Sequence, residues 1–435
     1  MHEHIIIISL DALGSEDFNR IKDTEGFAYL IENGGYSDTV RSVYPSLTYP
    51  AHTTIVTGKL PRNHGVINNT KLQPEREKPD WYWYKKDIHG GTIYDIAKNQ
   101  KKTVAAFLWP VTGRSGITYN LPEILPVRFY QTQVGQVLQA GSPRFCLEID
   151  KKFSHLRQGI EEPYLDNFTH EAAKYTFKKY APYMTLIHYV DLDSIRHKHG
   201  YDSPEAGESL KRYAEKIKNW IDFLKLEGKL DTTLLVVLGD HSQMPVDKVI
   251  RPNVFLRKLG LIRMLENDIV DWKAYFKSCD GSGYIYVKNK KNTELLDLLR
   301  DNLTVLSAYE ENGIKNFIDG RFAGIMGADP TCAFMLEAQR GFYFSEDPCG
   351  EYSEEVKADD GKPIPGLLQS SHGYHPSYED YKTVFLMAGP GVKRGVRVPD
   401  ICLIDEGPTI AKLMGSSLWG VDGRIRYEFI DYQKV

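Results

Sequence analysis

The sequence predicts an α/β fold in which a mostly parallel sheet is flanked by helices. Three apolar runs support this prediction, at residues 5–10, 184–190 and 232–238. Continuous β-branched runs without polar alternation are typical of parallel strands that are buried on both faces of a sheet. Between the second and third runs, residues 203–227 begin with Ser-Pro and repeat apolar residues at helical spacing. A strand, a helix and a strand in succession form a crossover unit of an α/β sheet.

After the third run, the predicted strands are shorter, which indicates an inserted unit. Short strands are expected at 283–287 and 331–336, with a helix at 292–309 between them. The chain then returns to the main sheet at 383–391, and a last helix is expected at 408–414. The predicted division is therefore a core formed by residues 1–245 and 366–435, and a smaller inserted α+β cap formed by residues 246–365.

The composition is that of a globular protein with a large core. The 435 residues are 42% hydrophobic and 26% charged, and the formal net charge is −4. These fractions exclude a disordered, collagen-like or disulfide-dense protein. A near-neutral balance also argues against a nucleic-acid binder that relies on a large basic field. We expect a small-molecule partner, and a monomer or a homodimer.

The five cysteines contain no C-x-x-C pair, which indicates neither a disulfide framework nor a cysteine-zinc site. The apolar run Ile5–Ile8 is too short for a secretion signal, and no stretch approaches the ~20 apolar residues of a membrane span. We therefore expect a cytoplasmic protein without a membrane partner. A chain from which a signal had been removed would have the same features.

Carboxylate and imidazole groups gather at four points, three of them after predicted strands and the fourth, at His372, just before the returning strand. The residues concerned are Asp11, Asp193, His197, Asp240, His241 and His372. The carboxyl ends of parallel strands meet at one edge of a sheet, where α/β proteins place their ligands. Each residue alone could be a helix cap or a core residue, but together they offer the oxygen and nitrogen donors that Zn²⁺ accepts. Six ligands suit two metals about 4 Å apart, an arrangement that stabilises both oxygens of a phosphoryl transfer.

A short helix is expected near Pro50, which suits a first helical turn, and Gly58 suits its C-terminal end. Thr48 or Tyr49 is expected at the cap. Thr48 would then present its hydroxyl where free N–H groups favour an anion. The hydroxyl is either a nucleophile held by a metal or a plain helix cap.

These motifs together resemble the nucleotide pyrophosphatase/phosphodiesterase branch of the alkaline phosphatase superfamily. The resemblance covers most of the predicted core and follows the family's order. The matching elements are Asp11, Thr48-Tyr49-Pro50, Thr57-Gly58, His64-Gly65, Asn68-Asn69, Asp193 with His197, Asp240-His241 and His372-Gly373-Tyr374. Each motif is short, and the ordered set is specific. The family usually has glycine where this chain has Ala12, and often Gly-Met after the Asp-His pair, where this chain has Ser242-Gln243-Met244.

The resemblance implies an alkaline-phosphatase-like core and two zinc ions, although the same donors also accept Mn²⁺ or Fe. One zinc would be held by Asp193, His197 and His372. The other would be held by Asp11, Asp240, His241 and the oxygen of Thr48. Thr48 would attack phosphorus and form a phospho-threonine intermediate.

The resemblance also assigns residues to the substrate. Asn69 would donate to a non-bridging phosphate oxygen, and Asn68 would take this role if the register slips by one. Tyr49 would stack on a nucleotide base, with Tyr119 as a second stacking partner; ordinary packing is the alternative for both rings. The implied activity is hydrolysis of phosphodiester or pyrophosphate bonds.

Other members of the superfamily are separated by residue type. Sulfatases need a Cys-x-Pro-x-Arg type segment, which this chain lacks, and alkaline phosphatases proper use serine and a third metal. A phosphonoacetate hydrolase-like C–P hydrolase, or a phosphomonoesterase, would use the same two-metal site and is the alternative reading. A binding protein that has lost catalysis is the remaining hypothesis.

Overall fold

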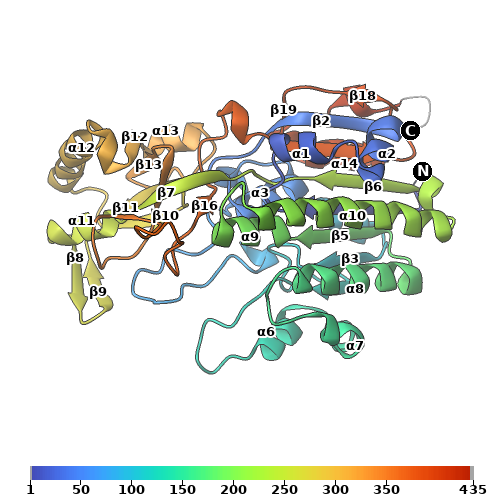
Figure 1. The fold of residues 1–435 in the computed structure, drawn as a ribbon, viewed down its shortest axis with the longest axis horizontal. Coiled ribbons are helices and arrows are strands. Elements are labelled where there is room, and N and C mark those ends of the chain that lie inside the picture. Colours follow the sequence, from blue (N-terminus) through green and yellow to red (C-terminus); the bar gives the residue numbers. More distant parts are fainter. Residues whose placement is uncertain (1, 432–435) are drawn as a thin grey trace.

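Nine strands form the central sheet of the computed structural model, which describes residues 2–431 (Figure 1). Their order across the sheet is β18-β2-β17-β6-β1-β5-β3-β4, and β19 pairs with β2. The neighbours β6, β1, β5, β3 and β4 run parallel to one another, and β17 runs antiparallel to both β6 and β2. The strands are β1 (His4–Leu10), β2 (Gly34–Arg41), β3 (Val104–Phe107), β4 (Tyr119–Leu121), β5 (Met184–Tyr189), β6 (Thr233–Leu238), β17 (Thr383–Ala388), β18 (Val396–Arg397) and β19 (Ile401–Cys402). The mostly parallel sheet predicted from the sequence is confirmed.

Helices cover both faces of this sheet, which explains why β1 is buried along its whole length. Ile6 and Ile8 of β1 pack into one apolar core, with residues of α1 (Ser15–Ile21), α2 (Glu25–Asn33), α8 (Tyr164–Tyr180) and α10 (Pro204–Leu226). Ile5 and Ile7 pack into a second core, with residues of α3 (Thr48–Thr57), α5 (Ile93–Asn99) and α14 (Glu406–Leu413). Successive side chains of a strand point to opposite faces, so continuous apolar runs are what a sheet covered twice requires.

The predicted crossover helix is α10, and its start has a clear cause. The side chain of Ser203 accepts a hydrogen bond from the backbone N–H of Ala206, and Pro204 occupies the first turn. Helix α9 (Asp191–His199) directly follows β5 and is followed by α10. Figure 1 shows α6 (Gln133–Ala140) and α7 (Pro143–Phe153) at the lower edge of the view, beyond α8. Among residues 2–431, no helix combines the length and apolar character that crossing a bilayer requires.

The segment after β6 forms its own sheets, at the left of Figure 1. One has the order β10-β11-β13-β12, and in another β7 pairs with β14, β15 and β16. The elements are β7 (Met244–Ile250), α11 (Pro252–Lys258), β8 (Ile262–Leu265), β9 (Asp268–Trp272), β10 (Ala274–Ser278), β11 (Ser282–Val287), α12 (Thr293–Ser307), β12 (Ile314–Asp319), α13 (Gly320–Ile325), β13 (Phe334–Ala338), β14 (Gly341–Phe344), β15 (Ser353–Glu355) and β16 (Ser370–Ser371). The strand expected at 331–336 begins at Phe334 instead, because the Asp329 carboxylate accepts hydrogen bonds from both the N–H and the hydroxyl of Thr331 and holds it in a turn.

The two ends of this segment are joined at β7 and β16. Met244 pairs with Ser371 and Pro245 pairs with Ser370 in an antiparallel ladder. The chain therefore leaves the central sheet and returns to it at neighbouring points. The inserted cap at 246–365 stays a proposal, supported by the four-stranded sheet and the separate apolar core of this segment.

Candidate metal centre and its cavity

The acidic and imidazole residues meet at the carboxyl edge of the central sheet. Asp11 follows β1, Asp240 follows β6, and α9 begins just after β5, the other neighbour of β1. The ligand atoms form two groups, in each of which they lie within 4.8 Å of one another. One group is Asp193, His197 and His372, and the other is Asp11, Asp240 and His241. The structure thus brings together the same two sets that the resemblance implies.

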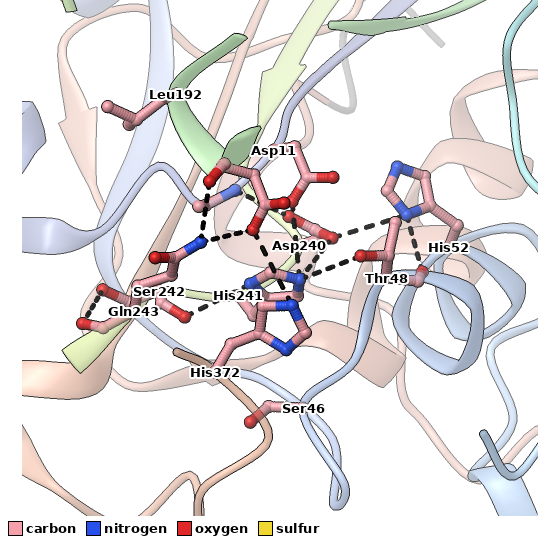
Figure 2. Close-up of polar contacts among 12 residues, drawn as sticks. Asp11, Ser46, Thr48, His52, Leu192, Asp240, His241, Ser242, Gln243 and His372 are labelled. Atoms are coloured by element: carbon pink, nitrogen blue, oxygen red, sulfur yellow. Dashed lines mark hydrogen bonds and ion pairs between the residues drawn. The ribbon is translucent and has the colours of Figure 1, made fainter. Parts of the chain in front are cut away.

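In the second group, the Nε2 atom of His241 lies between two carboxylates and a hydroxyl (Figure 2). It is 3.4 Å from Asp11 Oδ1, 3.2 Å from Asp240 Oδ2 and 3.2 Å from Thr48 Oγ1. The backbone N–H of Ala12 donates to Asp240 Oδ1 at 3.2 Å, so the residue after Asp11 also fixes the facing carboxylate. Ala12 has a φ of 62°, which explains why a glycine suits this position.

The first group is assembled from α9 and the loop after β16. Asp193 and His197 lie one helical turn apart, with His197 Nε2 at 3.4 Å from Asp193 Oδ2. His372 Nε2 lies 3.7 Å from Asp193 Oδ1. His197 donates through Nδ1 to the carbonyl of Ser370 at 2.8 Å, which fixes its tautomer and leaves Nε2 for a metal. Gln243, in the segment where the chain departs from the family, donates to the carboxylate of Asp193.

The electrostatics of the two groups fit cations. Burial and the nearby Asp240 and Asp193 raise the pKa of Asp11 well above its usual range. Burial raises the pKa of Asp240, and burial together with the adjacent His241 lowers the pKa of His372 well below its usual value. Within the described residues, Asp11 Oδ1, Asp240 Oδ2 and His372 Nδ1 are buried and have no hydrogen-bond partner. Buried carboxylate oxygens without hydrogen bonds are costly to ionise, and divalent cations would compensate their charge.

Helix α3 presents Thr48 to this centre. The helix begins at Thr48 itself, with Leu47 in extended geometry before it, and ends at Thr57, followed by the C-cap Gly58 with a φ of 66°. Pro50 lies in the first turn as predicted, but the expected Thr48 or Tyr49 cap is wrong by one residue. Thr48 is already helical, and its hydroxyl faces His241 instead of a backbone N–H of its own helix. The side-chain oxygen is therefore available to the centre.

The two asparagines point in different directions. Asn69 Oδ1 accepts a hydrogen bond from the backbone N–H of Tyr49 at 2.9 Å, and Asn69 lines the cavity beside Thr48. Asn68 donates through Nδ2 to the carbonyl of Ser278 at 2.6 Å and so ties its loop to β10. The structure therefore brings Asn69 rather than Asn68 to the centre, with its amide oxygen held and its amide nitrogen free to face a ligand.

A cavity of about 840 Å³ contains the centre and Tyr49, but it does not include Tyr119. Tyr49 is buried, and its ring packs edge-on against Trp81 at 5.3 Å between centroids. Tyr119 is absent from the cavity lining within the described residues; its ring stacks on Tyr180 at 4.5 Å and lies beside Phe145. The first tyrosine is thus placed to contact a ligand, and the second has a packing role.

Sequence reasoning missed His188, which lies within the apolar run at residues 184–190. His188 lies near the carboxyl end of β5, and its Nε2 is 3.0 Å from Asp11 Oδ2. Its Nδ1 is 3.2 Å from the Leu108 carbonyl and 3.7 Å from a carboxylate oxygen of Glu123. Burial opposes a charge on this imidazole, but Asp11 and Glu123 raise its pKa well above the usual value. The available signal was an imidazole inside an apolar strand, near the edge where ligands bind.

Comparison with known proteins shows the family to which the chain belongs. A family model described as type I phosphodiesterase/nucleotide pyrophosphatase matches residues 5–363. The chain belongs to this family. Membership supports phosphodiester hydrolysis as the reaction class and a dependence on metal ions.

Individual members of the type I phosphodiesterase family cover the chain to different extents. Human ectonucleotide pyrophosphatase/phosphodiesterase family member 5 is 21% identical over 429 residues, which are 96% of this chain and 77% of that protein. Human family member 1 is 27% identical over 244 residues, or 53% of this chain and 23% of that protein.

Solved structures of the family share the fold. The structure of human ectonucleotide pyrophosphatase/phosphodiesterase 5 superposes with a TM-score of 0.65, at 17% identity and with 97% of both chains covered. An inactive variant of the murine protein, solved in complex with AMP, has a TM-score of 0.64 at the same identity and coverage. The fold is therefore alkaline-phosphatase-like, as the resemblance implied.

Proposed function

We propose that the protein hydrolyses phosphodiester or pyrophosphate bonds, with Thr48 as the nucleophile and zinc in both ligand groups. The observation that carries this proposal is the position of the Thr48 hydroxyl, 3.2 Å from His241 Nε2, on the wall of a cavity that Asp11 and all three residues of the first group also line. When bound, the two metals would lower the pKa of a coordinated hydroxyl and neutralise charge on the transferring phosphoryl group.

The residues of the chain divide the work between attack and positioning. The Thr48 oxygen attacks phosphorus as the bond from phosphorus to the leaving oxygen breaks, and the leaving group departs as an alcohol or a phosphate. Water then cleaves the phospho-threonine and returns the proton to Thr48. The amide nitrogen of Asn69 and the backbone N–H of Thr48, at the start of α3, would donate to the non-bridging oxygens.

Tyr49 and Trp81 would contact the organic group next to phosphorus. Both rings line the cavity that contains Thr48 and Asn69. The murine relative supports a nucleotide as one class of ligand and a threonine as the reactive group, because its inactive variant, with alanine in place of threonine, was solved with AMP. A phosphonoacetate hydrolase or a phosphomonoesterase would need the same two ligand groups, so substrate comparison separates the alternatives.

The decisive experiment compares substrates and variants at fixed zinc. We expect p-nitrophenyl-TMP and bis(p-nitrophenyl) phosphate to be hydrolysed faster than p-nitrophenyl phosphate, and phosphonoacetate not to be cleaved. Thr48→Ala should lower kcat by roughly 10³-fold or more, since removal of a nucleophile disables the whole unit. Thr53→Ala is the matched control: Thr53 lies on the same helix, is buried, and bonds the Tyr49 carbonyl outside the cavity lining. Full activity of Thr48→Ala, or faster monoester turnover, would contradict the proposal.

Two further expectations stay predictions. The cytoplasmic location can be tested by fractionating cells that express the full-length gene. The choice between monomer and homodimer can be tested by light scattering of the purified chain.

A further inference from the structure

The turn between β10 and β11, residues 279–281, reaches from the inserted segment to the first ligand group. The backbone N–H of Gly281 donates to the carbonyl of His372 at 2.8 Å, and Ser282 donates through Oγ to the carbonyl of Gly373 at 2.7 Å. A Cβ atom on Gly373 would lie 1.7 Å from the carbonyl oxygen of Cys279, so only glycine permits this approach. The turn is therefore packed directly against the loop that carries His372.

Asp280 occupies the centre of this turn and lines the cavity. Its Oδ2 atom lies 3.8 Å from Nδ1 of His372, and its side chain is 30% exposed. The backbone holds the residue on both sides: its N–H donates to Ser278 Oγ at 2.8 Å, and its carbonyl accepts from the N–H of Phe344 at 2.8 Å. The carboxylate is thus held beside the first ligand group, with part of its surface open to the cavity.

The part of a substrate that Asp280 faces follows from the geometry of the reaction. Thr48 lies at the second ligand group, 3.2 Å from His241. In an in-line displacement the entering and leaving oxygens are on opposite sides of phosphorus, and a two-metal site stabilises both of them. Because the entering oxygen belongs to Thr48, the leaving oxygen would lie at the first group. The remainder of the leaving group would then lie near Asp280.

Within the described residues, the cavity wall around Asp280 offers no unpaired lysine or arginine. Arg157 is the only such residue among those that line the cavity, and it forms an ion pair with Asp150 of α7. Lys277 is near Asp280, but its Nζ atom is 2.7 Å from Glu346, and neither residue is among the described residues of the lining. A leaving group that carries its own negative charge would therefore meet a carboxylate without a compensating cation.

We propose that Asp280 is a specificity-determining residue that excludes anionic leaving groups, so that the substrates of this protein are phosphodiesters with an uncharged leaving alcohol rather than nucleoside polyphosphates. This inference rests on the proposed phosphodiesterase function. A pyrophosphate or a carboxylate held at the first group would be repelled by Asp280, whereas an uncharged alcohol would not. An unpaired charge placed against the wrong ligand is a common means of discrimination between ligands of similar shape.

The first test varies only the charge of the leaving group. Two aryl esters of thymidine monophosphate are compared, one of p-hydroxybenzoic acid and one of methyl p-hydroxybenzoate, which differ by one carboxylate. The zinc-loaded full chain is assayed at about pH 8, where carboxylates are ionised. We expect Asp280→Asn to raise the acid-to-ester ratio of kcat/KM at least tenfold, because one like charge at short range is removed. The ratio is compared between proteins, so the intrinsic reactivities of the two esters cancel.

Asparagine is the sharpest substitution at this position. Asp280 has a φ of 59°, which Asp and Asn both tolerate, and the amide oxygen of Asn can still face Nδ1 of His372. The variant should therefore keep its fold and its zinc, which elemental analysis checks. Asp400→Asn is the matched control, because Asp400 has a φ of 53° and lies outside the cavity lining, and it should keep the wild-type ratio. An unchanged ratio in Asp280→Asn, or an equal rise in the control, would overturn the inference while leaving the phosphodiesterase function intact.

A binding measurement separates specificity from turnover. Calorimetry with the zinc-loaded Thr48→Ala variant gives the dissociation constants of the same two esters. Addition of Asp280→Asn should tighten binding of the acid relative to the ester at least tenfold. If no diester is hydrolysed but this change is found, the proposed reaction is wrong and the role of Asp280 stands. An unchanged ratio of the two affinities would overturn that role whatever the turnover results.

Discussion

Replacing Asp17 by Asn removes one half of a buried ion pair that connects the two metal groups. Arg196 in α9 and Asp17 in α1 are both fully buried, and two hydrogen bonds of 2.8 and 2.6 Å join their side chains. Arg196 also donates to the carbonyl of Ala12 at 3.2 Å. Because Arg196 is in the helix that carries Asp193, and Ala12 follows Asp11, this single guanidinium fixes the backbone beside both groups.

The size of the effect follows from the burial of both charges. Breaking a buried pair from one side costs about 3–5 kcal/mol, since the remaining charge stays buried without its partner. A chain of 435 residues has an unfolding entropy of roughly 0.9 kcal/mol per kelvin, at about 2.1 cal/mol/K per residue. The Tm of Asp17→Asn should therefore fall by about 3–6 °C.

Differential scanning calorimetry of the metal-free protein measures this shift, and a chelator competition reports the accompanying loss of zinc affinity. The control is Asp202→Asn, which removes an ion pair to Arg20 of similar length, 2.8 Å, with both side chains at least half exposed. Exposed pairs contribute 0–1 kcal/mol, so its Tm should change by about 1 °C at most. The double variant Asp17→Asn/Arg196→Gln should be less destabilised than Asp17→Asn alone. Equal shifts for Asp17→Asn and Asp202→Asn would refute the reasoning.

Three other outcomes are expected. Dialysis against EDTA should abolish hydrolysis of bis(p-nitrophenyl) phosphate, and added zinc should restore it. A metal centre would be contradicted if the protein stayed active after elemental analysis had shown it to be metal-free. His188→Gln should lower zinc affinity by about 10–100-fold in a chelator competition, because His188 orients Asp11. Unchanged zinc affinity in this variant would contradict that role. Burial lowers the pKa of His64 and of His170 to about 3, so both stay neutral when folded and gain a proton on unfolding below about pH 6.5. The free energy of unfolding should therefore fall as the pH drops from 6.5 toward 3, by up to ~1.4 kcal/mol per pH unit for each histidine, and His64→Asn should flatten the dependence of Tm on pH.

The sheet and its ligand edge were predictable from the sequence because their signals are local. Three continuous apolar runs form neighbouring strands, and each run is followed within three residues by a carboxylate of the two ligand groups. The structure adds which strands are neighbours: β1 lies between β5 and β6, so Asp11 is central to the cluster. The antiparallel direction of β17 depends on how the chain returns from the cap, which no local pattern specifies.

Features that depend on tertiary contacts were less predictable. The contact of His188 with Asp11 joins residues that are far apart in the chain, and a polar residue inside a strand has several possible explanations. The sequence alone does not distinguish Tyr119 from Tyr49 as a stacking residue. In the structure, the ring of Tyr119 packs on Tyr180, whereas Tyr49 borders the cavity. The cavity beside the metal centre is formed by several segments whose apolar residues each look like ordinary core, and only their assembly leaves a space between them.

The pairing of β7 with β16 affects how this protein can change over evolution. The ladder holds the points where the chain departs and returns, close to His241 and His372, one ligand from each metal group. Closing a flexible loop costs only about 0.6 kcal/mol more for each doubling of its length, once its ends are fixed. Insertions and deletions in loops between residues 251 and 369 can thus accumulate with little penalty, except near Gly281 and Ser282, which donate to the carbonyls of His372 and Gly373. New recognition surfaces can arise in the other loops while the hydrolytic machinery is inherited unchanged.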